Sequence, residues 1–515
     1  MRSFFTISSA ALLLAVTASA QDVDAVVERA RQAFEVPGIA VAIVKDGRVV
    51  LSKGYGVRKL GEPAPVTPRS LFRIASNTKA FTVAALAMLV DEGKLRWDDR
   101  VIDHMPAFQM WDPYVTREMT VRDLLTHRSG LGLGAGDLMF WPATDFTRDQ
   151  ILARIRFLKP ASSFRSHYAY DNLLYLVAGQ MIPLITGKTW EQFVQERIFD
   201  PLGMAHTNAS TPLLASSADA AAPHARADGR LVALPQTDHD NNAPAGSINS
   251  CVEDLAKWML LQLDRGGKLF TGRQSKEMWS PQTILPINDL PKGAPEALQA
   301  TQPQFNAYGL GWMLRDYRGH KMVYHTGVLA GYVSRTTLIP DLNLGVVVLT
   351  NQEEDGAHSA IARTVVDHYL GAPPTDWVST YRELARLEAA EGAAEEHRAA
   401  GTRNTASRPS LPLARYAGHY RDSWYGDVVI EERNGKLAIQ FSHTKQLAGD
   451  LEHWQYDTFI ARWRDRTLGA DAYVTFSLGA DGAIEGVRIK PVSPLTDFSF
   501  DFQDLDLRRV DAAAR

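Results

Sequence analysis

The sequence predicts an α/β domain followed by a C-terminal all-β antiparallel barrel. In residues 21–372, β-rich segments lie near both ends and helical sequence lies between them. This order indicates one sheet that is assembled from distant segments and covered by helices. After a polar linker, residues 413–515 change to short β-rich segments with hairpin turns, which is typical of a small barrel or sandwich. With 515 residues, 45% of them hydrophobic, the chain can bury a large core and form more than one domain.

The N-terminus has the pattern of a secretory signal. A basic start at Arg2 precedes an uncharged apolar stretch, and Ala18-Ser19-Ala20 has the small-x-small form of a signal peptidase site. We therefore expect residues 1–20 to be removed by cleavage after Ala20 and the mature protein to be periplasmic or secreted. No later stretch reaches ~20 uninterrupted apolar residues, so the sequence predicts no membrane span.

Composition argues against several kinds of site. A formal net charge of −4 with 22% charged residues gives no basic patch that would indicate nucleic-acid binding. Cys251 is the only cysteine, which excludes an intramolecular disulfide, and we expect it to be a small buried apolar residue. The fourteen histidines show no His-x-x-x-His spacing, so the sequence predicts neither a metal site nor a cofactor.

The elements of the first domain follow from its apolar pattern. Residues 23–34 form an amphipathic helix, and Asp46-Gly47 is a two-residue hairpin signal between two β-rich runs. Residues 72–270 are mostly helical, with Gly and Pro between the helices. The predicted strands are Ile39–Val44, Arg48–Ser52, Met322–His325, Val333–Ile339 and Leu344–Thr350.

A change of composition marks the second domain. We assign residues 373–412 to a helical and polar linker, and hairpin turns at Asn434-Gly435 and Asp481-Gly482 then separate short strands. The aromatic residues concentrated there could line a ligand cavity, but a barrel core with an aromatic rim is the favoured interpretation. His443 and His453 are expected to mark the surface of this region.

Ser76-Asn77-Thr78-Lys79 is the first motif that carries chemistry. A serine hydroxyl needs a proton acceptor held against it, and a spacing of three residues places Lys79 on the same helical face as Ser76. Residues 80–90 are apolar nearly all round, so Lys79 would enter a dry interior where a neutral amine is accessible. By itself the tetrapeptide is weak evidence, because Ser-x-x-Lys occurs by chance on many helix surfaces.

Two further segments could complete such a site. A tyrosine near cations has a lowered pKa and can exchange a proton with the serine, which makes Tyr170 a candidate, and Asn172 could bond both the lysine and a substrate amide. His325-Thr326-Gly327 ends a strand, and its glycine would let a substrate backbone approach the strand edge closely.

These residues together resemble the serine β-lactamase and penicillin-binding-protein superfamily, most closely its class C-like branch of D-aminopeptidases, DD-peptidases and esterases. The motifs Ser-x-x-Lys, Tyr-x-Asn and a His-x-Gly variant of Lys-Thr-Gly occur in that order. The resemblance covers about residues 25–370 and includes the segments Phe72–Ala75, Thr120–Leu131, Pro201–Met204, Pro244–Ser247, Tyr308–Trp312 and Gly331–Asn351. It implies an α+β sandwich with a central antiparallel sheet beside an all-helical region. Residues 416–510 resemble the lipocalin-like domain appended to some members, which can cover the active-site mouth or mediate association.

The resemblance also implies roles for individual residues. Ser76 would be the acylated nucleophile, Lys79 its base and Tyr170 the residue that moves protons in acylation and deacylation. Asn172 would orient the substrate and Lys79. The oxyanion hole would consist of the backbone N–H groups of Ser76 and Val328, while His325, Thr326 and Gly327 would contact the substrate.

His325 is where the chain departs from the superfamily pattern. Members that bind a substrate carboxylate usually have lysine at this position, whereas histidine, with an ordinary pKa of ~6.5, would be a weaker and pH-dependent anchor. The histidine variant resembles the D-aminopeptidases and some esterases of the branch, and this resemblance implies peptides or amides containing D-residues, or small esters, as substrates. His127 and Arg128 lie in a family-like segment, where we expect a structural role.

Three functions therefore remain open. The leading hypothesis is an exported serine hydrolase that acts through an acyl-enzyme on a small peptide, amide or ester. The second is a β-lactamase or DD-carboxypeptidase. The third is a penicillin-binding-type receptor that forms stable adducts. The sequence does not indicate an oligomeric state.

Overall fold

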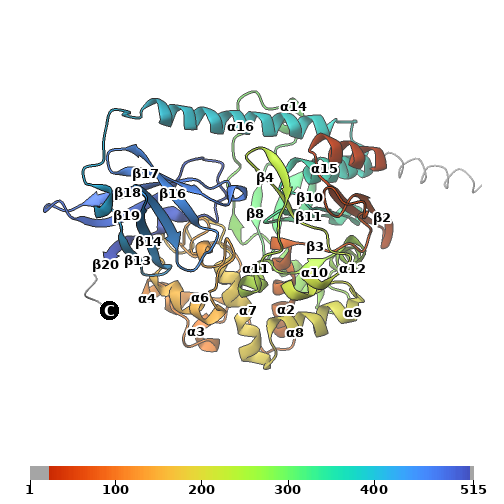
Figure 1. Cartoon of the computed structure of the whole chain (residues 1–515). Helices are drawn as coiled ribbons and strands as arrows, with labels where there is room; N and C mark the ends of the chain where they lie inside the picture. Colours follow the sequence, from red (N-terminus) through yellow and green to blue (C-terminus); the bar gives the residue numbers. More distant parts are fainter. Residues whose placement is uncertain (1–22, 511–515) are drawn as a thin grey trace, which may run out of the picture.

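The computed structural model describes residues 23–510 and shows an α/β domain beside a β-barrel (Figure 1). The predicted fold class is confirmed. The long helix α16 (Trp377–Gly401) runs along one edge of both parts. The predicted signal segment, residues 1–20 with cleavage after Ala20, lies outside the described residues. Within residues 23–510, no helix is both long and apolar enough to cross a membrane.

The α/β domain is built on an eight-stranded antiparallel sheet with the order β2-β1-β12-β11-β10-β9-β8-β7. Its strands are β1 (Gly38–Lys45), β2 (Arg48–Gly56), β7 (Thr283–Ile284), β8 (Asn306–Tyr308), β9 (Met313–Tyr317), β10 (His320–Leu329), β11 (Tyr332–Ile339) and β12 (Leu344–Thr350). Ile39 of β1 lies opposite Thr350 of β12, so the two ends of the domain meet in one sheet, as the sequence predicts. Asp46 and Gly47 have φ values of 49° and 74°, the left-handed conformations that a tight turn between β1 and β2 requires.

The central strands are buried on both faces because helices cover both. Val41 and Ile43 of β1 belong to one apolar cluster, and the alternate residues Ala40 and Ala42 belong to the other. Residues 23–33 are helical, and the other helices of the domain are α2 (Thr78–Asp91), α3 (Val101–His104), α4 (Pro113–Glu118), α5 (Val121–Leu124), α6 (Arg148–Arg154), α7 (Leu173–Thr186), α8 (Trp190–Val194), α9 (Asp200–Leu202), α10 (Thr211–Ser216), α11 (Ala243–Gly246), α12 (Val252–Leu263), α13 (Gly272–Met278), α14 (Glu296–Gln299) and α15 (Gly356–Leu370). Small strand pairs, β3 (Phe72–Arg73) with β6 (Asn249–Ser250) and β4 (His224–Ala227) with β5 (Arg230–Ala233), lie outside the main sheet.

Helix α2 is the centre of the helical region. Every residue from Thr78 to Leu89 is buried, which explains why its sequence is apolar nearly all round. Phe81 stacks on Trp258 of α12 with ring centroids 3.9 Å apart. Cys251 is fully buried, as expected, directly before α12. The helix that carries Lys79 is therefore fixed on all sides by the core.

The C-terminal region is a closed eight-stranded antiparallel barrel. Its strands are β13 (Gly418–Asp422), β14 (Gly426–Arg433), β15 (Lys436–Phe441), β16 (Ala448–Gln455), β17 (Thr458–Trp463), β18 (Ala472–Leu478), β19 (Ile484–Pro491) and β20 (Leu507–Val510). Aromatic side chains fill its interior: Phe441, Phe459, Trp463 and Phe476 are all buried and pack edge to face with their neighbours. The aromatic residues therefore form a core, as the favoured interpretation predicts.

The barrel packs against the α/β domain through specific contacts. The His443 imidazole stacks on Phe146 at 3.9 Å, and its Nδ1 lies 2.6 Å from Asp145 Oδ1. His443 lies at the barrel surface, as expected, and this part of the surface packs against the α/β domain. His453 stays at the surface, hydrogen-bonded to the Tyr456 carbonyl.

Candidate active site

Ser76 lies in a sharp turn between a short strand and the buried helix α2. The turn is a 3-10 segment, η1 (Ala75–Asn77), and Ala75 has a φ of 47°, a strained left-handed conformation for a residue with a side chain. Backbone N–H groups in the first turn of a helix have no partner within the helix. The Ser76 N–H is one of these groups, and its side chain is only half-buried. The turn therefore presents both the hydroxyl and the N–H of one residue.

Lys79 contacts Ser76 from the first turn of α2. Its Nζ lies 3.0 Å from Ser76 Oγ, 2.6 Å from Asn172 Oδ1 and 3.1 Å from the Ala245 carbonyl oxygen. The side chain is fully buried, as the apolar helix predicts. Burial lowers the pKa of Lys79 to about 7, although the nearby acidic groups oppose this. At neutral pH a substantial fraction of the amine is unprotonated and can accept a proton from Ser76.

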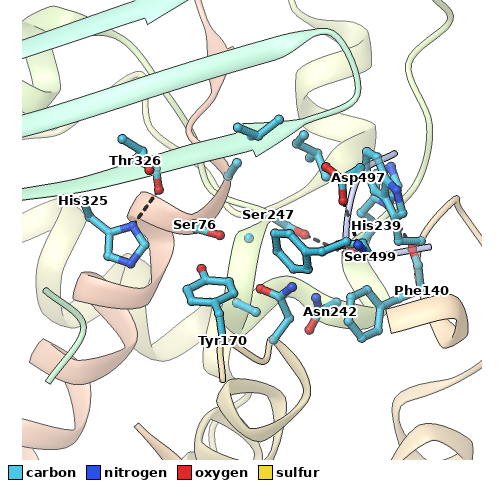
Figure 2. A pocket seen from close by; sticks show the side chains of 18 of the residues that line it. Ser76, Phe140, Tyr170, His239, Asn242, Ser247, His325, Thr326, Asp497 and Ser499 are labelled. Carbon is cyan, nitrogen blue, oxygen red and sulfur yellow. Dashed lines mark hydrogen bonds between the residues drawn. The ribbon is translucent and has the colours of Figure 1, made fainter. Parts of the chain in front are cut away.

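The Tyr170 phenol faces Ser76 across the pocket (Figure 2). Lys79 Nζ lies 4.8 Å from the centre of its ring. The expectation that a neighbouring cation lowers the pKa of Tyr170 is wrong: burial raises it well above the ordinary value. Desolvation outweighs the contact with the Ser76 hydroxyl, which by itself lowers the pKa of Tyr170. Tyr170 is thus a protonated phenol that can donate a hydrogen bond into the site.

Asn172, at the start of α7, connects Lys79 to a buried acid. Its Oδ1 accepts from Lys79, and its Nδ2 donates to Asp137 Oδ2 at 2.9 Å. The same Asp137 oxygen accepts from Ser499 Oγ at 2.8 Å. Burial raises the pKa of Asp137 to about 8. Asp137 and Ser499 belong to the site but were not found from the sequence, because they are 362 residues apart and neither lies in a motif.

His325 is buried beside Tyr170, with 1% of its surface exposed (Figure 2). Its Nδ1 lies 2.6 Å from the Thr326 carbonyl oxygen, which can only accept, so Nδ1 carries the proton. Nε2 then accepts from the Tyr308 hydroxyl at 3.0 Å. Burial, with a smaller contribution from Lys79, lowers the pKa of His325 to about 3. The expectation of a pH-dependent carboxylate anchor is therefore wrong: both ring nitrogens are occupied and the imidazole stays neutral.

Gly327 lets β10 pass directly beside the turn that carries Ser76. A Cβ at this position would lie 2.3 Å from the Ile74 carbonyl oxygen and 2.8 Å from the Ser76 nitrogen. The close approach that this glycine permits in the structure is that of the chain's own Ser76 turn, while the approach of a substrate backbone stays a prediction. Gly327 thus brings β10 within contact distance of the nucleophile turn.

Val328 follows Gly327 on β10 and lines the same pocket as Ser76. Leu329 and Tyr332 close a two-residue hairpin loop between β10 and β11 and form the hydrogen-bonded pair. Hydrogen-bonded and non-hydrogen-bonded pairs alternate along antiparallel strands, so the Val328 N–H points away from β11. Ser76 and Val328 both line the same pocket, so their N–H groups are the candidate pair of donors.

Ser76, Tyr170, Asn172, His325 and Val328 line a pocket of about 280 Å³, and Lys79 lies behind Ser76. Ser76 and Tyr170 face its interior, and aromatic and apolar side chains form much of its wall (Figure 2). The wall includes three consecutive residues of the barrel domain, Asp497, Phe498 and Ser499. Phe498 meets the Tyr170 ring edge to face at 5.8 Å. The barrel thus contributes to the site itself. The wall residues are Phe140, Trp141, Tyr168, Met313, Val328, Leu329 and Phe498.

His127 supports Tyr170 from behind. The two rings are 4.3 Å apart, and His127 Nδ1 accepts from the Asp171 N–H at 3.2 Å. Burial lowers the pKa of His127, so it remains neutral. His127 does not line the pocket. This geometry agrees with the structural role expected for this segment.

Comparison with known proteins gives two family matches. The model described as "Beta-lactamase" matches residues 23–371, and a "Domain of unknown function (DUF3471)" matches residues 402–509. Among curated relatives, "Unguisins hydrolase ungD'" of Aspergillus campestris is 30% identical over 511 residues, which cover 91% of this chain and 89% of that protein. "Protein flp" of Staphylococcus aureus strain MW2 is 29% identical and covers 65% of this chain and 63% of its own. A solved structure, the octameric penicillin-binding protein homologue from Pyrococcus abyssi, shares the fold with a TM-score of 0.60 and 22% identity over 95% of this chain and 99% of that one.

Proposed function

Because the chain belongs to the β-lactamase family, we propose that it is an exported serine hydrolase that cleaves peptide or amide bonds, or small esters, through an acyl-enzyme on Ser76. The observation that carries the proposal is the contact between Lys79 Nζ and Ser76 Oγ at 3.0 Å, beside Tyr170 and at the base of a pocket. A nucleophile held against a base of nearly neutral pKa is the arrangement that covalent catalysis requires. A relative named as a hydrolase supports the same class of reaction.

The acylation step follows from the geometry. Neutral Lys79 accepts the Ser76 proton while Oγ attacks the carbonyl carbon, and the N–H groups of Ser76 and Val328 hold the oxyanion that forms. Tyr170 then donates its phenolic proton to the leaving nitrogen or oxygen as the bond to the carbonyl carbon breaks. Lys79, protonated in the first step, returns a proton to the phenolate. Water releases the acyl group with the same residues acting in the opposite order.

The pocket favours substrates without a carboxylate near the scissile bond. Among its lining residues within 23–510, none is a lysine or arginine, and His325 is neutral. A carboxylate brought into this wall would lose its hydration without gaining a cation. We therefore propose amides, internal peptide bonds, including those of D-residue-containing or other non-standard peptides, and small esters as substrates. A β-lactamase or DD-carboxypeptidase is the alternative, and both classically bind a substrate carboxylate.

Acyl trapping tests the proposed nucleophile. A fluorophosphonate probe should add one label to the intact protein, Ser76→Ala should abolish the label, and the exposed Ser423→Ala should keep it. A label that survives in Ser76→Ala would refute the assignment. A panel of D- and L-aminoacyl p-nitroanilides, p-nitrophenyl esters and nitrocefin then separates the functions. Fast turnover of nitrocefin without turnover of the other substrates would favour a β-lactamase. Labelling of one site per protein without release of the acyl group would favour a receptor.

A further inference from the structure

The connection between β19 and β20 reaches from the barrel into the wall of the pocket. Three of its residues make separate contacts with the α/β domain. Phe498 packs on Tyr170, and the Asp501 carboxylate accepts from the N–H groups of Gly136 and Leu138 at 2.6 and 3.1 Å. Asp501 thus holds the backbone on both sides of Asp137. The third residue, Ser499, donates a hydrogen bond to the side chain of Asp137 itself.

From Ser499 a continuous series of hydrogen bonds leads to the nucleophile. Ser499 and Asn172 both donate to Asp137 Oδ2, at 2.8 and 2.9 Å, Asn172 accepts from Lys79 at 2.6 Å, and Lys79 lies 3.0 Å from Ser76. Asp137 Oδ1 is buried and has no hydrogen-bond partner in the described part of the chain. The two bonds to Oδ2 therefore fix the orientation of this carboxyl group.

The orientation of Asp137 decides which end of the Asn172 amide faces Lys79. Asp137 Oδ2 accepts from Ser499, and as an acceptor it selects the Asn172 amide nitrogen and leaves Oδ1 for the lysine. If the Asn172 amide were flipped, its NH₂ group instead of Oδ1 would face Lys79 Nζ, and the present hydrogen bond would be lost. Ser499 thus begins the series of hydrogen bonds that orients Lys79.

We infer that Ser499, supplied by the barrel domain, is a positioning residue for the Lys79 base and acts through Asp137 and Asn172. The inference rests on the proposed function. Without the Ser499 hydroxyl, the buried Asp137 carboxyl group would keep one donor and could rotate. Asn172 would then hold Lys79 less precisely. The pocket volume and the residues that touch the substrate would change little.

The test separates turnover from binding. Ser499→Ala should lower kcat about tenfold, within the range for losing one buried hydrogen bond, while KM stays within about twofold. Ser499→Thr, which keeps the hydroxyl, should restore kcat to within about threefold of the natural chain. Ser493→Ala, a matched change in the same connection, should leave both constants unchanged. An unchanged kcat in Ser499→Ala, or an equal loss in Ser493→Ala, would overturn the inference.

A double-mutant comparison tests the route. Asp137→Ala, which removes both carboxyl oxygens, should lower kcat by itself, and adding Ser499→Ala to it should cause no further loss because the acceptor is already gone. An equal further loss would show that Ser499 acts by another route and overturn the inference. If Ser499→Ala does not fold by circular dichroism, Ser499→Cys takes its place, and a natural kcat there would count against the inference. Ser76→Ala distinguishes the two proposals: labelling that persists in it refutes the proposed function, whereas its loss together with a normal Ser499→Ala refutes only the role of Ser499.

Discussion

The α/β domain and the barrel contribute to the same pocket through different kinds of structure. The α/β domain supplies Ser76, Lys79 and Val328 from the turn, helix and strand at the centre of its core, where Lys79 is fully buried. The barrel supplies Phe498 and Ser499 from an irregular connection, and Phe498 is 38% exposed. Groups that exchange protons must be held rigidly and away from water, whereas the side chains of the pocket wall only have to shape the space for the substrate. Changes in the first region should remove the reaction, and changes in the second should adjust its rate and selectivity.

The largest effect is expected for the base. Lys79→Met should lower the rate of acylation ~10³-fold, within the range for loss of a general base. Methionine fits the apolar surroundings of the side chain, so the fold should persist. Rapid-quench labelling with the fluorophosphonate probe measures the rate. Lys94→Met, which removes an exposed ion pair with Glu92 just beyond the same helix, is the control. A rate within tenfold of the natural chain would mean that another group accepts the Ser76 proton.

The second largest effect concerns the frame around the nucleophile. Gly327→Ala places a methyl group 2.3 Å from the Ile74 carbonyl oxygen and should push the Ser76 turn away from β10. A displacement of about 1 Å can cost about 100-fold in rate, so we expect a loss of that size in acylation. Gly272→Ala, where an added Cβ has nothing within 4 Å, is the control. Normal acylation in Gly327→Ala would show that the spacing between turn and strand does not matter.

The pH dependence of kcat/KM tests the charge states of the groups around Ser76. Since the pKa of Lys79 is lowered to about 7, its neutral form is lost below that pH, and kcat/KM should fall about tenfold per pH unit there. The raised pKa of Tyr170 keeps the phenol protonated, so this residue should cause no decline up to about pH 9. His325 stays neutral throughout, and His325→Gln should leave the acidic decline in place. A decline that moves or disappears in His325→Gln would assign the titration to the histidine.

The sequence allowed the reacting groups to be predicted better than their charge states. Ser76, Lys79, Tyr170 and Asn172 lie in short motifs. In the structure Ser76, Tyr170 and Asn172 line one pocket with Val328, and Lys79 contacts Ser76 and Asn172. The protonation of a buried group depends on the chain that surrounds it. The predicted direction for Tyr170 was therefore wrong, because nearest-neighbour reasoning considered the lysine and omitted the desolvation.

The contribution of the barrel could not be predicted for a related reason. Asp137 and Ser499 meet across 362 residues, and His443 meets Asp145 across 298. None of these residues lies in a recognisable motif. The apolar pattern of the barrel strands identifies its core, but it does not indicate which connection leaves the barrel or where that connection lies.

The smallest expected effect concerns the wall. Phe498→Ala removes a side chain that lines the pocket and packs on Tyr170, so it should enlarge the space beside the nucleophile. We expect kcat/KM for bulky aminoacyl p-nitroanilides to rise about fivefold relative to that for small ones, since a change in an apolar pocket discriminates by only a few kcal/mol. Phe157→Ala, with a similar exposed fraction of 40% against 38%, lies outside the pocket and should leave the ratio unchanged. A ratio that stays constant in Phe498→Ala would mean that the wall does not influence substrate choice. A loss of acylation rate comparable to that of Gly327→Ala would mean that the wall belongs to the catalytic frame. Either result would contradict the proposed difference between the two regions.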